Sequence, residues 1–182
     1  IRTIDYYLCH QSAVSSGMQK LYSEKLYPFA KTSAVYRPLV KNKDLINDDR
    51  YKVAQTPAMK NGYITFGTLN NISKVSDQVI SVWADVLKKV DGSKIFIESP
   101  GLHQRDFVRD FTGRFAQFGI SSDRVILRNR ETRFQYVRWN EIDIALDPFP
   151  YGGGTTTFQC LWMGVPVVTL AAATAMSRNA VG

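Results

Sequence analysis

Three glycines followed by three threonines, at Gly152–Thr157, form the segment of this sequence best suited to hold an anion. Glycines allow a ligand to approach the backbone closely. The threonines stand where a helix is expected to begin, with unpaired N–H groups and a partial positive charge. A glycine turn whose threonine only caps a helix fits the motif equally well. Lys74, in a loop after an earlier predicted strand, is the cation that would help to hold a diphosphate; alone, it also fits a solvated loop lysine.

Other familiar phosphate and metal motifs are missing from the chain. No GxxxxGK[ST] loop is present, and no GxGxxG opens a helix after the first strand of the predicted sheet, which argues against an ATPase and a dinucleotide dehydrogenase. Asp143 and Asp147 flank a strand and do not form the D-x-D pair that binds Mg²⁺ or Mn²⁺ in many sugar transferases. We expect Asp147 to cap a turn with Pro148. Phosphate charge is then expected to be met by amides, hydroxyls and Lys74, with no metal and no cofactor.

Composition narrows the function classes. The chain has 182 residues and a formal net charge of +7, but its basic residues are scattered and often lie beside acids. This favours anionic small ligands over nucleic acid, which remains a distant alternative. The apolar run Val165–Ala173 is too short to span a membrane, and no signal segment opens the sequence. Cys9 and Cys160 have no metal-ligand or disulfide spacing, so a reducing, cytoplasmic setting is expected.

The elements that must position these residues alternate between β-rich runs and helical periodicity from about Gly62 onward. Strands are predicted at 63–66, 94–98, 124–127, 142–146 and 166–170. Helices are predicted from 76, over 107–118, over 132–140 and through 160–163. This order predicts an α/β fold with a parallel, Rossmann-like sheet. Ligands bind at the carboxyl ends of such strands, so the loops at 67–74, 128–132 and 147–157 are expected to share one edge.

The apolar pattern also predicts the core and the domain boundary. Trp83 and Trp162 are expected to pack in the core, as is the face of the second helix that runs from Phe107 to Phe118. In the first sixty residues, 4–8 is predicted as a strand, 18–27 as a helix and 41–52 as a polar linker. We place a domain boundary near residue 55.

Two runs of the sequence resemble a known family. The first comprises 63–67 and Asn70-Asn71-Ile72-Ser73-Lys74, followed by Trp83; the second is 142–157, followed by 161–170. Both are similar to the bacterial relatives of O-linked N-acetylglucosamine transferase and the SPINDLY proteins. Ile4-Asp5-Tyr6, 22–26 and Tyr36-Arg37-Pro38 extend the similarity to nearly the whole chain.

The resemblance implies the C-terminal lobe of a glycosyltransferase-B fold, with the tail of the N-terminal lobe. Residues 1–55 would be the end of the N-terminal catalytic lobe and a linker, and 56–182 a C-terminal nucleotide-sugar-binding lobe truncated at its C-terminus. The implied activity is transfer of N-acetylglucosamine from UDP-GlcNAc to Ser or Thr of a protein acceptor. An upstream lobe and tetratricopeptide repeats are implied partners. His10 and His103 match no family motif, so catalytic residues stay unassigned, and the isolated chain is expected to bind donor without turnover.

The resemblance also implies a donor-binding set. Lys74 and Asn71 would lie at the diphosphate, and Gly153, Gly154 and the threonines would present donors to it. Gln159 stands where the family has an acid that bonds the ribose, the backbone of Asn129 and Arg130 would read the base edge, and Gln135 would lie near the base face. The full set is Asn71, Lys74, Asn129, Arg130, Gln135, Gly153, Gly154, Thr155, Thr156, Thr157 and Gln159.

Several alternatives stay open. Human-type enzymes have histidines at the positions of Gly154 and Gln135, so a fucosyl or glucosyl donor is a competing hypothesis. The chain could also be a non-catalytic nucleotide-binding or interaction module. Gln159 could simply face solvent, and Arg178, which matches a family Ser-Arg pair, has no assigned role.

Overall fold

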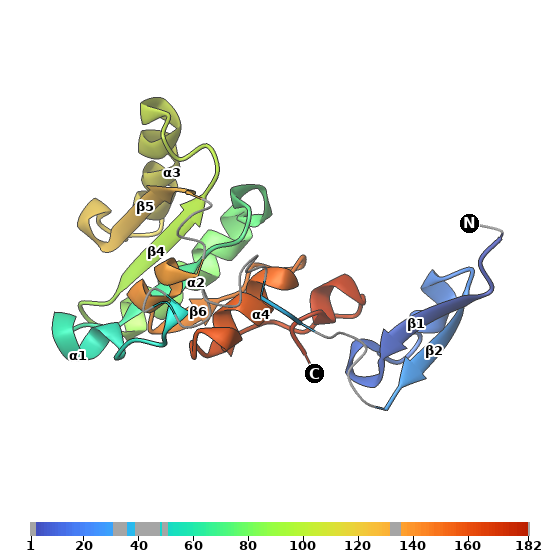
Figure 1. Ribbon diagram of the computed structural model, residues 1–182. Coiled ribbons are helices and arrows are strands. Elements are labelled where there is room, and N and C mark those ends of the chain that lie inside the picture. Colours follow the sequence, from blue (N-terminus) through green and yellow to red (C-terminus); the bar gives the residue numbers. More distant parts are fainter. Residues whose placement is uncertain (1–2, 31–35, 39–47, 49–50, 132–135, 182) are drawn as a thin grey trace.

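The computed structural model describes residues 3–30, 36–38, 48, 51–131 and 136–181. A five-stranded sheet forms its larger part, in the order β5-β4-β3-β6-β7, and every neighbouring pair is parallel (Figure 1). The strands are β3 Thr65–Thr68, β4 Lys94–Ser99, β5 Val125–Asn129, β6 Ile144–Leu146 and β7 Val167–Val168. The predicted parallel α/β fold is therefore confirmed, and the ends of the strands differ from the predicted ones by at most two residues.

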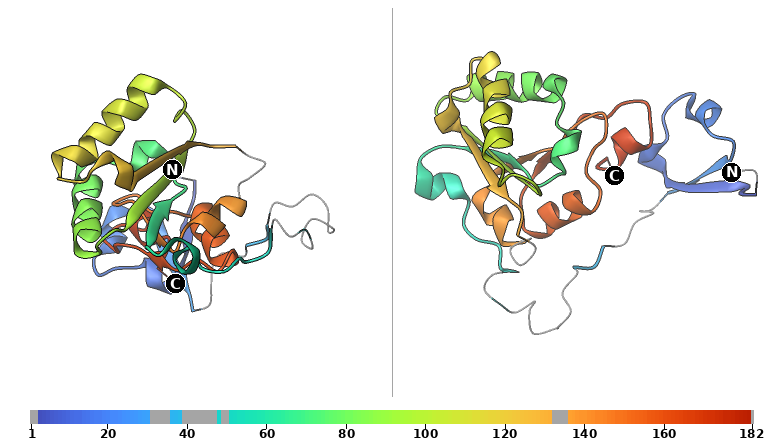
Figure 2. Two further views of the ribbon diagram at one scale, coloured as in Figure 1. Left: turned by 90° about the vertical axis from the view of Figure 1, so that its left-hand side faces the viewer. Right: turned by 90° about the horizontal axis from the view of Figure 1, so that it is seen from above.

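Two helices, α2 Asp77–Lys89 and α3 Arg105–Gln117, cover one face of this sheet (Figure 2). The hydroxyl of Ser76 accepts from the amide of Val79 at 3.4 Å and starts α2, whose buried face includes Trp83 as predicted. On α3 the expectation holds only in part. Phe111 and Phe115 are buried, but Phe107 is 40% exposed because the first turn of α3 projects past the sheet.

The opposite face is covered by α4 Thr155–Trp162 and by the 3₁₀ helix η8 Val137–Glu141, which share a second core. Of the helix predicted over 132–140, residues 132–135 lie outside the described residues, and the rest forms η8. Trp162 corrects another expectation, since it is 46% exposed. It lies on the outer side of α4, where the stacked ring of Tyr36 covers only part of this helix.

Asp143 anchors the amino end of β6, opposite to the predicted ligand edge. Its carboxylate accepts from the amides of Ala58, in helix α1 Pro57–Asn61, and Thr65, both at 2.8 Å. Asp143 and Asp147 therefore serve opposite ends of the same strand and do not form a pair.

Residues 3–30 contain a separate two-stranded parallel sheet of β1 Tyr6–His10 and β2 Lys25–Phe29, with the short helices η1 Gln11–Ala13 and η2 Met18–Leu21 between them. The predicted strand at 4–8 is confirmed with a shift of two residues. The helix predicted over 18–27 is wrong. Only Met18 of η2 is buried and Leu21 is 65% exposed, so a longer helix would have no core to bury its apolar face, whereas 25–29 pairs with β1.

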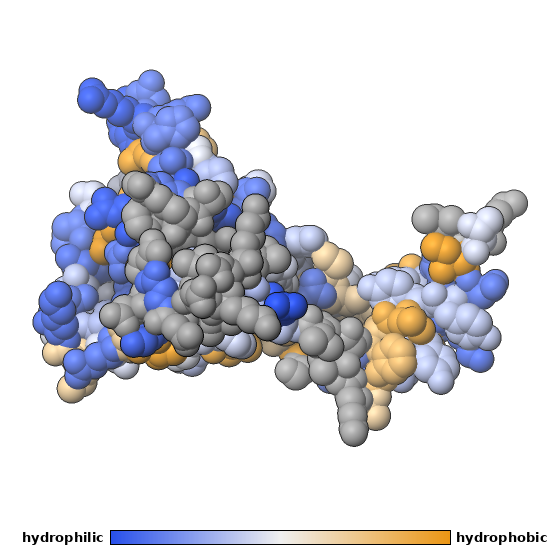
Figure 3. All heavy atoms as spheres, viewed as in Figure 1, coloured by the Kyte–Doolittle hydropathy of each residue, from blue (hydrophilic) through white to orange (hydrophobic). Residues whose placement is uncertain are grey.

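This small sheet carries apolar side chains at its surface, including Leu8 at 60% exposure (Figure 3). It is joined to the end of the chain by hydrogen bonds from Arg178 Nε to Ser12 O at 2.7 Å and from Ser15 Oγ to Ala173 O at 2.6 Å. The linker predicted at 41–52 lies largely outside the described residues, and the boundary near residue 55 stays a prediction. Among the described helices, none is long and apolar enough to cross a membrane.

Candidate functional site

The loops after β3 and β5, the end of β4 and the start of α4 line a cavity of about 210 Å³ at the carboxyl edge of the sheet. Its lining residues are Leu69, Glu98, Arg130, Thr155, Thr156 and Gln159. Four of these belong to the predicted donor-binding set, so the expectation that the loops share one edge is confirmed. Glu98 and Leu69 were not predicted.

The first turn of α4 borders this cavity. Gly154 caps the helix, and its carbonyl accepts from the amides of Thr157 at 3.0 Å and Phe158 at 3.2 Å. The amides of Thr155 and Thr156 precede the first intrahelical bond and belong to the orphan donors of the helix end. The Thr157 hydroxyl is buried, and no described residue bonds it. This turn therefore offers neutral donors and the positive end of a helix dipole to a group in the cavity.

Asp147 is buried directly after β6, and its carboxylate holds the glycine loop through a hydrogen bond from the loop backbone. Its carboxylate accepts from the amide of Gly153 at 2.7 Å, from Asn70 Nδ2 at 3.3 Å and from Thr169 Oγ1 at 3.0 Å. Burial raises the pKa of this carboxyl, and the hydrogen bonds and Lys74 oppose that rise. The expectation that Asp147 caps a turn with Pro148 is wrong, because a buried carboxylate needs several donors and the loop at 152–153 and its neighbours supply them.

The close fit of this carboxylate explains two of the glycines. A Cβ on Gly152 would lie 2.7 Å from Asp147 Oδ2. A Cβ on Gly153 would lie 2.9 Å from Asp147 Oδ1 and closer still to the Thr157 hydroxyl. Gly154 differs, since a Cβ there meets nothing within 4 Å. The first two glycines are therefore required by packing, and the third leaves open space at the helix start.

Lys74 is connected to the same loop. It ends the 3₁₀ helix η5 Ile72–Lys74, and its Nζ donates to Gly152 O at 2.9 Å and to Asn70 Oδ1 at 3.2 Å. The ammonium also lies 4.3 Å from the ring centroid of Tyr151. Burial lowers the pKa of Lys74, and Asp147 acts against that effect. The structure thus brings Lys74 to the glycine turn, while its contact with a diphosphate stays a prediction.

Glu98 and Arg130 also line the cavity, and Arg138 pairs with Glu98 behind it. Glu98, which is 1% exposed, accepts from Arg138 Nε at 3.0 Å and lies 3.8 Å from Arg130 Nε. Arg130 also donates to the carbonyls of Leu69 and Glu98, so it connects the loop after β3 to the end of β4. Burial raises the pKa of Glu98, and both arginines counter it. The resemblance implies that the backbone of Asn129 and Arg130 reads the base edge, which stays a prediction. The structure adds the side chain of Arg130 to the cavity wall.

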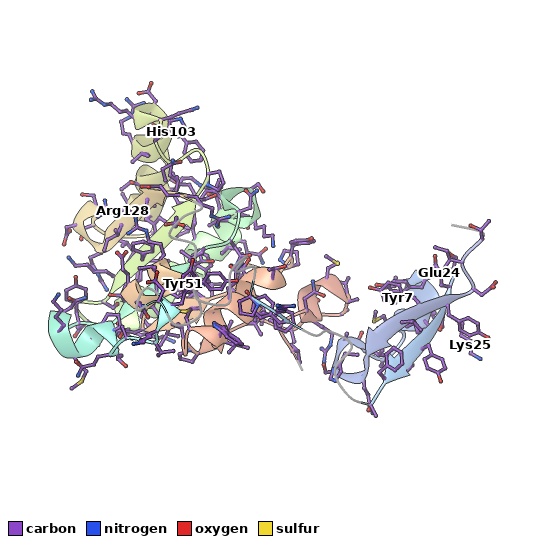
Figure 4. The ribbon with its side chains drawn as sticks, in the orientation of Figure 1. Tyr7, Glu24, Lys25, Tyr51, His103 and Arg128 are labelled. Carbon is purple, nitrogen blue, oxygen red and sulfur yellow. The ribbon has the colours of Figure 1, made fainter. Side chains whose placement is uncertain are left out.

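Two predicted residues, Asn71 and Asn129, do not line this cavity. The Asn71 side chain is exposed and caps η5 by accepting from Ser73 N at 3.0 Å. Asn129 Oδ1 accepts from Gly101 N at 3.1 Å and lies 3.3 Å from His103 Nδ1, in the loop before α3 (Figure 4). Gln135 lies outside the described residues. Of the acids, cysteines and histidines that are described, no group of three or more is arranged to hold a metal.

The burial of Asn70, Asp147 and Glu98 was not predicted, because nothing in a single sequence marks a polar residue as buried. Their one available signal was position, since each lies at or just after the end of a predicted strand. Gln159, for which a solvent-facing position had stayed open, is 4% exposed and faces the cavity.

A parallel α/β lobe with a helix N-terminus, a lysine and a polar cavity at its carboxyl edge belongs to the class of open α/β sheets, in which ligands bind beyond the carboxyl ends of the strands. Comparison with known proteins adds the family. The model of glycosyl transferase family 41 matches residues 45–182, and the chain belongs to this family.

The similar proteins are longer than this chain. It is 32% identical over 173 residues to a probable UDP-N-acetylglucosamine–peptide N-acetylglucosaminyltransferase SPINDLY of Eustoma exaltatum subsp. russellianum, covering 92% of this chain and 18% of the relative. The protein of the same description in Arabidopsis thaliana is 32% identical over 174 residues, covering 93% and 18%. A mutant O-GlcNAc transferase of Thermobaculum terrenum superposes with a TM-score of 0.82 at 29% identity, covering 98% of this chain and 32% of that one. The chain thus has part of a glycosyltransferase-B fold and spans about a fifth of its curated relatives.

Proposed function

We propose that this chain is the donor-binding part of a glycosyltransferase that moves N-acetylglucosamine from UDP-GlcNAc to Ser or Thr hydroxyls of proteins. The observation that carries the proposal is the cavity bordered by the first turn of α4, with Lys74 bonded to the adjacent glycine loop. Relatives named as peptide N-acetylglucosaminyltransferases support the choice of sugar and acceptor.

In this proposal the diphosphate is held without a metal. The amides of Thr155 and Thr156, the threonine hydroxyls and the Lys74 ammonium would meet the charge that grows on the diphosphate as the glycosidic bond breaks. A helix end contributes about 0.3–1 kcal/mol toward an anion at an exposed site, so the lysine is needed for tight binding. The buried Asp147 holds the amide of Gly153 and would preorganise the loop. No general base is assigned.

The proposal extends to the remainder of the protein. An upstream catalytic lobe and tetratricopeptide repeats are proposed partners, since the chain covers only 18% of its relatives. The exposed apolar side chains of the β1–β2 sheet are compatible with a neighbouring lobe. A cytoplasmic location is proposed because both cysteines, Cys9 and Cys160, are free thiols, as is usual in a reducing compartment.

Calorimetric titration with uridine diphosphate and guanosine diphosphate, each with and without Mg²⁺, tests the proposal. Saturable, metal-independent binding of uridine diphosphate is expected. Preference for guanosine diphosphate would instead favour a different sugar donor, such as a fucosyl donor, and binding of neither nucleotide would refute a donor-binding role for this chain.

Lys74→Ala assigns the binding to this site. Loss of a charge-assisted contact predicts about 10- to 100-fold weaker binding. Lys88→Ala is the matched control. Lys88 lies on α2, its side chain is 49% exposed, and its ion pair with the exposed Asp85 is 3.4 Å long. Equal affinity of Lys74→Ala and Lys88→Ala would remove Lys74 from the site.

A further inference from the structure

A second cavity, of about 300 Å³, adjoins the first turn of α4. Its other walls come from the β1–β2 sheet and from the 3₁₀ helix η9 Met176–Arg178, which lies near the red end of the chain between α4 and that sheet (Figures 1 and 2). Thr155 lines both this cavity and the 210 Å³ cavity described above. The two cavities therefore meet at the start of α4, where the diphosphate is proposed to bind.

The second cavity has a wall that suits an anion. Arg178 lines it together with His10 and Asn179, and none of the described lining residues is an acid. The turn of α4 adds the amide of Thr155, which precedes the first intrahelical hydrogen bond, and the positive end of the helix dipole. A Cβ on Gly154 would meet nothing within 4 Å, so there is open space beside this turn. A negatively charged group could lie there without meeting a carboxylate of the described wall.

Arg178 is held by backbone oxygens and not by a carboxylate. Its Nε donates to Ser12 O at 2.7 Å, and its Nη1 donates to Ala172 O at 3.4 Å in an exposed contact. Within the described part of the chain, its Nη2 has no hydrogen-bond partner and its guanidinium has no ion pair. Carbonyl oxygens orient a guanidinium without neutralising it, so the charge of Arg178 remains available to a ligand.

The Ser12 carbonyl that holds Arg178 is itself fixed. The Ser12 hydroxyl donates to the Val181 carbonyl and lies 2.5 Å from His10 Nδ1. Ser12 is thus bonded to two residues of the chain end, Arg178 and Val181, and to the last residue of β1. The position of the Arg178 guanidinium at the cavity wall therefore depends on the β1–β2 sheet.

We propose that Arg178 is a diphosphate-binding residue of the donor site, which meets the phosphates from the side of the β1–β2 sheet. The inference rests on the proposed donor-binding function and deepens it by a second cation. A diphosphate carries more than one negative charge, whereas Lys74 supplies a single cation whose Nζ is shared with Gly152 O and Asn70 Oδ1. A guanidinium can also form paired hydrogen bonds with a phosphate group. The β1–β2 sheet, which holds Arg178 through Ser12, is in this way part of the donor site.

Arg178→Gln removes the charge and keeps an amide that can donate to the Ser12 carbonyl. Calorimetry on this chain uses uridine diphosphate, or guanosine diphosphate if the wild type prefers it, and in parallel inorganic pyrophosphate. We expect about 10-fold or more weaker binding of both probes, from the loss of a charge-assisted contact with the phosphates. Arg178→Lys keeps the charge without the planar fork and should recover part of this affinity. Arg109→Gln is the matched control, since the side chain of Arg109 on α3 is 71% exposed, and should leave both affinities unchanged.

Ser15→Ala separates phosphate binding from a purely structural link. The Ser15 hydroxyl forms a further hydrogen bond between the small sheet and the chain end, to Ala173 O at 2.6 Å, and carries no charge. Ser15→Ala should therefore keep wild-type affinity for both probes. Wild-type affinity for either probe in Arg178→Gln, an equal loss in Ser15→Ala, or no recovery in Arg178→Lys would each overturn the inference while leaving the site at Lys74 intact. A wild-type chain that binds neither nucleotide would instead overturn the proposed function, and the inference with it.

Discussion

Replacing Gly153 with alanine tests whether the buried Asp147 sets the shape of the donor site. The new Cβ would lie 2.9 Å from Asp147 Oδ1 and still closer to the Thr157 hydroxyl, so the loop or the carboxylate must move. Overpacking of this kind costs about 1–3 kcal/mol. The same movement strains the 2.7 Å bond from the Gly153 amide to Asp147, and hydrogen bonds to charged groups are worth about 1.5–3 kcal/mol.

Since the two effects share one movement, we expect Gly153→Ala to lower the free energy of unfolding by about 2–3 kcal/mol. Nucleotide binding should weaken by about 10-fold or more, because donors displaced from their geometry lose charge-assisted contacts. Urea denaturation measures the first quantity and calorimetry the second. Gly154→Ala is the internal control, since its Cβ meets nothing within 4 Å, and its stability should stay within about 0.5 kcal/mol of the wild type. Equal behaviour of the two variants would refute the role given to Asp147.

Three further predictions concern charged groups. Burial lowers the pKa of Lys74, so nucleotide affinity should fall with rising pH earlier than for an ordinary lysine; a Lys74→Met variant that keeps the same alkaline profile in calorimetry would contradict this. Burial raises the pKa of Asp147 in the folded state, so this carboxyl binds its proton more tightly when folded, and its contribution to stability grows as pH falls through the folded pKa. Urea denaturation across acidic pH should show this gain in the wild type and not in Asp147→Asn, and identical slopes would exclude it. Glu98→Gln should lower the free energy of unfolding by about 2 kcal/mol in urea denaturation. This is less than the ~3–5 kcal/mol lost when a fully buried pair is broken, because the side chains of Arg130 and Arg138 are partly exposed to water. An unchanged free energy of unfolding would refute a stabilising role of the Glu98 charge.

The sheet and its ligand edge were predictable because their signals are local. The apolar spacing of α2 with Ser76 before it, and the β-rich run at 94–98, are properties of neighbouring residues. Once five such strands alternate with helices, right-handed crossovers place every strand's carboxyl end on one side. The loops that carry Lys74, Arg130 and Thr155 could therefore be assigned to one edge without coordinates.

The failures concern residues whose state depends on distant partners. The stretch 18–27 has apolar residues at helical spacing, but 25–29 pairs with β1. The local pattern of residues does not indicate which strand a segment will pair with. Phe107 and Trp162 have core-type side chains and lie at the ends and outer faces of helices, where the core does not reach. Asp147 and Asn70, seventy-seven residues apart in sequence, share a hydrogen bond that no spacing rule indicates.

By itself, the sequence determined the fold class, the edge at which a ligand would bind, and the glycine–threonine turn and lysine that suit a diphosphate. These follow from backbone periodicity and from the chemistry of single residues, which act over a few positions. Only the tertiary structure decided which glycines are sterically required, that the side chain of Arg130 lines the cavity, and that Tyr36 stacks on Phe158 of α4. Those properties arise from burial, which removes water as a partner and makes each polar group depend on whatever the fold brings within hydrogen-bond distance.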